Sequence, residues 1–181
     1  MSSTMATFGN SSLTLEDLQW VFENHHRLYD MFYEAQNFTP VANVLRNLST
    51  DVEVETLMAI LWAGIEFIVK PPSPIRQSIS RRISVILHDM RVLPGATMLD
   101  ISQEIMNFYD YRCDVVHGNR PMISDWNSMR NGHINNDDFR GLDALQGTFN
   151  VFRLLFIGVI ERGGFFSKEE LIELEKKFHE S

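Results

Sequence analysis

The sequence predicts an all-α protein, a single-domain bundle of about five long helices with shorter helices between them. Apolar residues recur at three- and four-residue spacing in one segment after another, which is the helical period. Proline, glycine and capping residues separate these segments, and no stretch alternates apolar and polar residues as a half-buried strand does. At 181 residues and 44% hydrophobic composition, the chain is long enough for one core and short for two.

The first part of the chain contains a polar leader and two predicted helices. Residues 1–12 are rich in Ser, Thr, Gly and Asn and are expected to be disordered, which leaves 13–181 as the helical domain. Thr14 is a candidate N-cap for a helix of about 20 residues, with apolar positions at helical spacing over Leu18–Tyr33. Pro40 is suited to the first turn of a short second helix.

Three helices are expected in the middle of the chain. Val52–Val69 is strongly apolar on most faces and stops at Pro71-Pro72, so we expect it at the centre of the bundle. Ile75–Met90 and Met98–His117 repeat apolar residues at the same spacing, and Pro94-Gly95 separates them.

In the last third of the chain, a polar segment first interrupts the helical pattern. Residues 119–136 are polar and read as a long loop, a length that in a compact domain is often functional or mobile. Helical periodicity resumes over Asp137–Ile160 and ends at Gly163-Gly164. Residues 167–170 form a capping box for a last helix that reaches about Phe178.

Charge and composition restrict the function. The net charge of −8 argues against a surface that binds nucleic acid everywhere, so any RNA contact must be confined to a local site. The single cysteine, Cys113, excludes an internal disulfide and a multi-cysteine zinc site, and nothing indicates another cofactor. No signal peptide is evident, and the longest apolar runs fall short of the roughly 20 residues of a membrane span. We therefore expect a cytoplasmic protein without a membrane association.

The segment YRCDVVHGN, Tyr111–Asn119, carries the strongest functional signal. Arg112 and His117 lie near the end of a predicted helix, and a glycine follows the histidine directly. Imidazole exchanges a proton near neutral pH, and guanidinium offers a permanent charge and a planar fork of donors to phosphate oxygens. Cleavage of an RNA phosphodiester needs both kinds of group.

These residues also resemble a known family. FYDYRCDVVHGN is similar to the signature of the HEPN superfamily, in which a histidine follows an arginine after four to six residues, and more narrowly to its Apea-like group. The segments LMAILWAGIEFIV, which contains Glu66, and RRISVILHDM resemble the two helices that precede the motif in that group. The resemblance covers roughly residues 50–120 well and the final helices loosely.

The resemblance implies a helical bundle that forms a homodimer through the motif helix. In active members Arg112 and His117 would be the catalytic residues of a metal-independent endoribonuclease. Such members serve in toxin–antitoxin and antiviral defence systems, which implies RNA and an antitoxin or regulatory protein as partners. Other members are inactive modules for dimerisation or partner binding. Cys113 stands where the family usually has asparagine, aspartate or histidine, which favours the inactive alternative.

The chemistry itself also favours a dimer. When the 2′-hydroxyl of RNA attacks the phosphate, one group takes its proton, another protonates the leaving 5′-oxygen, and positive charge stabilises the phosphorane. One chain supplies one imidazole at the motif, whereas a two-fold dimer supplies two. The expected product is a 2′,3′-cyclic phosphate.

Arg112 and His117 each have a structural alternative. Arg112 is a possible partner of Glu66, because a carboxylate in an apolar helix needs a cation. His117 is a possible cap of its helix, where a cation is favoured. Positions five apart are separated by roughly 140° around a helix, so the two side chains do not share a face. Asp114 is three positions from His117 and is a candidate to orient the imidazole.

The neighbouring residues are supporting candidates. Tyr111 is a packing residue or a contact to ribose, and Cys113 is a small buried residue rather than a nucleophile. Arg120 and Arg130 would add positive charge for RNA if the polar loop folds back, but a loop of mixed charge is also consistent with a solvated surface.

Overall fold

The chain is helical throughout the part that its structure describes. The computed structural model describes residues 15–33, 39–48, 53–121 and 136–180. The helices in these ranges are α1 (Leu15–Tyr33), α2 (Thr39–Leu48), α3 (Val54–Val69), α4 (Ile75–Asp89), α5 (Met98–Val116), α7 (Asn136–Arg162) and α8 (Lys168–Glu180). The prediction of an all-α single domain is confirmed for these residues. The predicted leader, most of the polar loop and Arg130 lie outside the described ranges.

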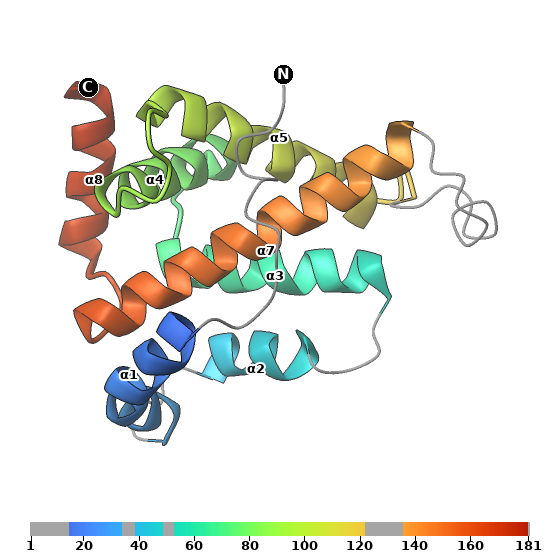
Figure 1. Ribbon diagram of the computed structural model, residues 1–181. Coiled ribbons are helices and arrows are strands. Elements are labelled where there is room, and N and C mark those ends of the chain that lie inside the picture. Colours follow the sequence, from blue (N-terminus) through green and yellow to red (C-terminus); the bar gives the residue numbers. More distant parts are fainter. Residues whose placement is uncertain (1–14, 34–38, 49–52, 122–135, 181) are drawn as a thin grey trace.

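Helix α3 occupies the centre of the bundle, as its composition predicts. It packs against α2, α4, α5 and α7, and α7 crosses the molecule beside it (Figure 1). Its side chains at Leu61, Trp62 and Ile65 have no exposed surface. Burial of such side chains contributes about 1.5–3 kcal/mol each, so this helix supplies much of the core.

Two glycines allow the central helices to approach one another closely. A Cβ atom at Gly64 would lie 2.7 Å from Val44 on α2 and 2.8 Å from the Phe152 ring on α7. A Cβ atom at Gly147 on α7 would lie 2.2 Å from the Phe108 ring on α5. The Phe108 ring of α5 thus packs directly against the backbone of α7 at Gly147, where any side chain would be in the way.

Arg82 on α4 fastens α3 and α8 to the rest of the bundle. Its side chain is only 5% exposed and donates from Nη1 to the carbonyl oxygens of Val69 at 2.7 Å and Lys70 at 2.5 Å. Its Nε donates to Glu175 on α8 at 2.8 Å. The same carboxylate accepts a short hydrogen bond from Ser78. The buried guanidinium therefore has three oxygen acceptors.

Helix α7 meets the length and composition of a membrane span. Its most apolar window is nevertheless 56% buried inside the bundle, which is typical of a core helix.

Candidate functional site

The motif forms the C-terminal end of α5. The helix begins with a capping box in which the Thr97 hydroxyl accepts from the Asp100 backbone N–H and the Asp100 carboxylate accepts from Thr97. It ends at His117, because Gly118 adopts a left-handed conformation with a φ of 71°. Asn119 then turns back and donates its N–H to the carbonyl oxygen of Asp114 at 2.8 Å.

Arg112 extends from α5 towards α3 and forms the expected ion pair with Glu66. The distance from Nη2 to Oε1 is 3.8 Å, and the two side chains are 20% and 30% exposed. This separation is an ion pair but is too long for a hydrogen bond. Nη1 lies 3.9 Å from the Cys113 sulfur, and the buried Nε has no hydrogen-bond partner. Within the described residues, the guanidinium therefore donates no hydrogen bond to an oxygen.

Two aromatic rings form the base of this site. The Arg112 guanidinium lies 5.6 Å from the centre of the Tyr109 ring, which packs edge-on against the buried Trp62 at 5.1 Å. Burial raises the pKa of the Tyr109 phenol, and the Glu66 carboxylate adds to this effect. Tyr109 is therefore a neutral phenol beside the Arg112–Glu66 pair. Sequence reasoning missed both rings as site residues, although Trp62 lies four positions before Glu66 and Tyr109 three before Arg112.

His117 is exposed at the end of α5. It is the C-cap residue, and its backbone N–H donates to Cys113. Its imidazole forms no hydrogen bond or ion pair with another described residue. Its place at the helix terminus fits the structural alternative, while its exposure leaves the ring accessible to a ligand.

Asp114 and Arg120 pair with one another rather than with His117. The distance between the Arg120 guanidinium and the Asp114 carboxylate is 3.2 Å, and the same guanidinium lies 5.1 Å from the centre of the half-buried Tyr111 ring. Burial raises the pKa of Tyr111, and the Arg120 charge opposes that rise. Asp114 therefore does not orient the imidazole, and the charge of Arg120 is largely neutralised.

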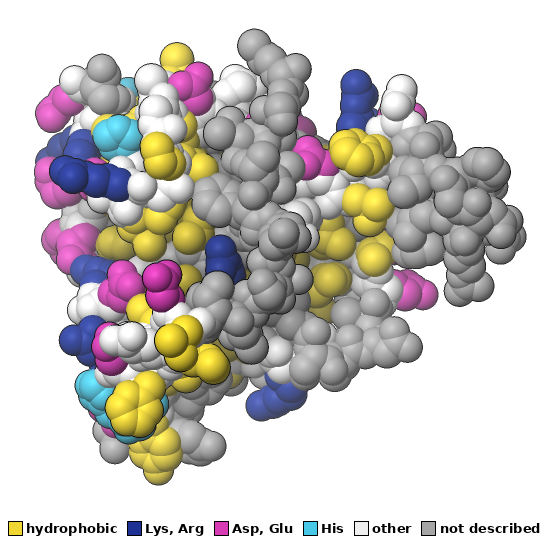
Figure 2. Space-filling model, in the orientation of Figure 1, with side chains coloured by type: hydrophobic (Ala, Val, Ile, Leu, Met, Phe, Trp, Pro, Cys, Tyr) yellow, Lys and Arg dark blue, Asp and Glu magenta, His cyan; other side chains and the backbone are white. Residues whose placement is uncertain are grey.

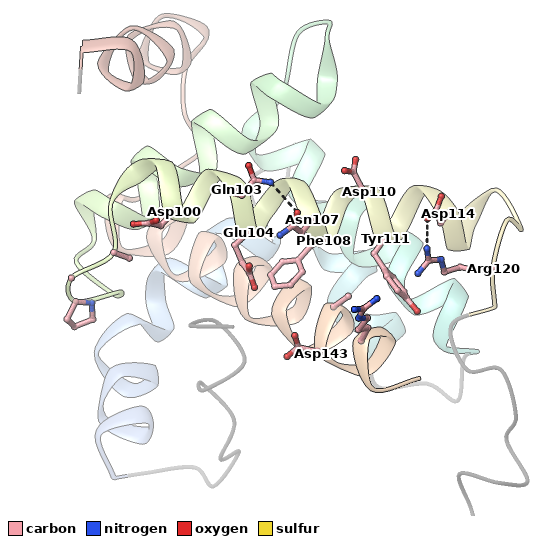
Figure 3. Close-up of a pocket in the computed structure, with 15 residues that line it drawn as sticks. Asp100, Gln103, Glu104, Asn107, Phe108, Asp110, Tyr111, Asp114, Arg120 and Asp143 are labelled. Carbon is pink, nitrogen blue, oxygen red and sulfur yellow. Dashed lines mark hydrogen bonds and ion pairs between the residues drawn. The ribbon is translucent and has the colours of Figure 1, made fainter. Parts of the chain in front are cut away.

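A large groove lies on a different face of α5. It has a volume of about 1080 Å³, lies between α5 and α7, and is lined by neither Arg112 nor His117 (Figure 3). Its charged lining residues are mainly acidic, with five carboxylates and two arginines: Asp100, Glu104, Asp110, Asp114, Asp143, Arg120 and Arg140. Burial raises the pKa of Asp143, and the neighbouring Glu104 raises it further.

This groove is unsuited to RNA as it stands. Asp110 accepts two hydrogen bonds from Arg76, at 2.6 and 2.5 Å, and Asp114 pairs with Arg120 (Figure 3), so these two arginines are already engaged by carboxylates. Phosphate groups would be repelled here. The groove was not predictable from the sequence, because its residues come from two helices and the loops beside α5, and its charged residues resemble solvated surface charges.

Comparison with known proteins adds no assignment. No protein-family model matches the chain, and neither a curated protein nor a solved structure is significantly similar to it. Among the described residues, no three His, Cys, Asp or Glu side chains converge as metal ligands would.

Proposed function

We propose that this chain is a metal-independent endoribonuclease of the HEPN type, a cytoplasmic homodimer that acts in defence or in a toxin–antitoxin pair. The observation that supports the proposal is the state of Arg112. Its side chain is only 20% exposed, yet its guanidinium donates to no oxygen within the described part of the chain. Its Nη2 atom makes only the long ion pair with Glu66, and a phosphate oxygen would give this donor an acceptor.

The proposed reaction is attack of the RNA 2′-oxygen on the neighbouring phosphorus. The P–O2′ bond forms and the P–O5′ bond breaks. One His117 imidazole takes the proton of the 2′-hydroxyl, and a protonated His117 of the second chain gives a proton to the leaving 5′-oxygen. Arg112 donates to the non-bridging oxygens, where negative charge increases in the transition state. The products are a 2′,3′-cyclic phosphate and a 5′-hydroxyl.

The reaction requires two imidazoles and therefore a dimer that brings two α5 ends together. Val116, beside His117, has 41% of its surface exposed, which supports a contact with another chain at this end of the helix. An antitoxin or regulatory protein is expected to restrain such an enzyme, since free ribonuclease activity harms its own cell.

A catalytically inactive helical module is the second candidate, and two observations favour it. Glu66 neutralises much of the charge on Arg112, which gives the arginine a structural role. The acidic groove on the adjacent face of α5 disfavours a polyanion. In this alternative the chain dimerises or binds a protein partner, and His117 ends its helix.

Cleavage of a labelled RNA in the presence of EDTA tests the proposal. We expect the wild type to cleave and the His117→Ala variant to lose 10²-fold or more of the rate, roughly the contribution of a general acid or base. His88→Ala is a matched control, because His88 is also an exposed histidine at the end of a helix. Its rate and the melting temperatures of both variants should match the wild type.

The alternative outcomes are distinct. Cleavage that EDTA abolishes contradicts the metal-independent mechanism. Absence of cleavage in the wild type, together with a large loss of stability in Arg112→Met, contradicts the nuclease and supports the inactive module. Mass spectrometry of the product ends identifies the cyclic phosphate.

A further inference from the structure

Helix α1 is attached to the bundle through one mixed polar and apolar face. It lies at the edge of the molecule beside the C-terminal end of α7 (Figure 1). The Trp20 indole donates to the Glu161 carboxylate at 3.0 Å, and Arg27 donates to the Glu161 carbonyl oxygen at 2.8 Å. Asn24 and Met31, on the same face, are 9% and 8% exposed. The inward face of α1 is thus held by these two hydrogen bonds and by packing of Trp20, Leu28 and Met31 against the core.

The outward face of α1 is apolar. Five large side chains are exposed there: Leu15 by 81%, Leu18 by 55%, Val21 by 47%, Phe22 by 76% and Tyr29 by 60%. Figure 2 shows apolar side chains with histidine beside them at the surface where Figure 1 places this helix. A surface helix normally has the reverse arrangement, with its apolar stripe towards the core.

The spacing on this face is that of a helix–helix seam. Leu15, Leu18, Phe22, His25 and Tyr29 follow one another at alternating steps of three and four residues, which is the a/d pattern of a heptad repeat. In the same register Trp20 and Arg27 occupy f positions, directly opposite the seam. The residues that attach α1 to α7 are therefore the ones that would face away from a partner helix.

We propose that this seam, defined by Leu15, Leu18, Phe22, His25 and Tyr29, pairs with the same seam of a second copy of this chain. The positions that flank it are Gln19, Val21, His26 and Leu28, none of which carries a permanent charge. Charged flanks select a complementary partner and repel an identical one, so uncharged flanks permit self-association.

The exposed area is sufficient for a dimer. An aromatic side chain carries roughly 150–250 Å² and an aliphatic one less, so the four exposed apolar members of the seam and the flanking Val21 offer at most about 600 Å² on each copy. A two-fold pair would bury up to about 1,200 Å², which is the lower end of the range for specific interfaces. This contact is separate from the pairing of α5 ends in the proposed nuclease, and it holds whether or not the chain cleaves RNA.

Cross-linking at Phe22 tests the pairing. Phe22 is the middle residue of the seam, so the two copies of it meet whether the helices run parallel or antiparallel. In a Cys113→Ser background, Phe22→Cys should form a disulfide-linked dimer under mild oxidation. Leu99→Cys is the control, because Leu99 is 68% exposed on α5 and lies outside the seam. Leu15→Cys should cross-link efficiently only if the helices are parallel.

Sedimentation gives the second measurement. Between about 1 and 100 µM, we expect the wild type to change from monomer to dimer. The double variant Leu18→Glu, Phe22→Glu should raise the dissociation constant of the dimer at least tenfold, which is ~1.4 kcal/mol. Leu99→Glu should match the wild type. Because Leu18 and Phe22 are exposed, neither change should alter helix content by circular dichroism.

Two outcomes overturn the proposal. One is cross-linking of Phe22→Cys no greater than that of Leu99→Cys. The other is a wild-type mass that the double glutamate variant leaves unchanged, including a wild type that stays monomeric throughout. If the wild type stays monomeric, the seam of α1 would instead bind a different protein. None of these measurements depends on RNA cleavage, so they fail or succeed independently of the proposed function.

Discussion

Arg82 and Arg112 are both arginines in low-solvent surroundings beside a glutamate, but their contacts differ. Arg82 donates three hydrogen bonds to oxygens of α3 and α8, at 2.5 to 2.8 Å. Arg112 reaches its glutamate only at 3.8 Å and has a buried Nε without a partner in the described structure. The contacts of Arg82 are those of a residue that holds helices together. The contacts of Arg112 leave donors available to a ligand, as the proposed phosphate contact requires.

This difference predicts unequal effects on stability. Arg82→Met would remove the donor to two backbone carbonyls and the cation that pairs with Glu175, and we expect it to lower the free energy of unfolding by about 3–5 kcal/mol. Arg112→Met removes no hydrogen bond to oxygen, so we expect a loss of about 1 kcal/mol or less. Urea unfolding measures both. Equal losses would identify Arg112 as a structural residue and favour the inactive module.

Asp143 provides a pH-dependent prediction. Burial and Glu104 raise the pKa of its carboxyl in the folded state above the unfolded value, so ionised Asp143 destabilises the fold. This cost is present above the folded-state pKa and disappears as the pH falls through that value towards the ordinary aspartate range. Asp143→Asn should therefore raise the melting temperature at pH 7 by about 1–3 °C, and the gain should shrink near pH 4.

The control for this change is Asp137→Asn. Asp137 is largely exposed in the first turn of α7 and pairs with Arg140, so its removal should not stabilise the protein at any pH. A gain that persists unchanged at low pH would show that the Asn side chain acts by a contact rather than by loss of charge.

At the scale of the helices, the crossing of α5 and α7 depends on a missing side chain. A methyl group at Gly147 would lie 2.2 Å from the Phe108 ring, which must then move. We expect Gly147→Ala to destabilise the protein by about 1–3 kcal/mol, the usual cost of overpacking. Gly158→Ala on the same helix is the matched control, because its methyl group would meet the flexible Met90 side chain at 3.4 Å.

Substitution of the two glycines by alanine should change the stability of the protein in opposite directions. Alanine is favoured over glycine within a helix by about 0.5–1 kcal/mol, so Gly158→Ala is expected to be neutral or slightly stabilising. Thermal unfolding of the two variants under identical conditions measures the difference. Equal stabilities would show that Phe108 moves away at little cost.

Helix periodicity predicts elements better than it predicts their surroundings. The apolar run before the two prolines predicted α3 and its central place, because a helix that is apolar on most faces is shielded from water only when other helices surround it. The stripe from Leu18 to Tyr29 predicted α1 equally well, but this face is the exposed one. Spacing shows that a helix has an apolar face. It does not show whether that face meets the core or another chain.

Only one contact of the candidate site, the ion pair between Glu66 and Arg112, was predictable from the sequence. Glu66 lies in an apolar helix, so a cation had to approach it, and Arg112 does. The acidic groove was not predictable, because Glu104 and Asp143 are far apart in the sequence and each reads as an ordinary surface charge. Tertiary packing alone brings them to one place.

For the whole molecule, the excess of negative charge determines how RNA could bind. The net charge is −8, and five of the seven charged residues that line the groove between α5 and α7 are carboxylates. Arg120 is paired with Asp114, and Arg76 with Asp110. Among the described residues beside His117, Arg112 is therefore the cation best placed to meet a phosphate, one from each chain of a dimer.

This confinement predicts a weak dependence of RNA binding on salt. Each phosphate of a single strand that a protein neutralises lowers the logarithm of the binding constant by about 0.7 per tenfold rise in salt. Two Arg112 side chains should therefore give a slope of about −1.4 in a plot of log binding constant against log salt. Fluorescence anisotropy with a labelled RNA and the His117→Ala variant measures it without cleavage. Arg112→Met should abolish the slope, and a slope steeper than about −3 would require a basic surface outside this site.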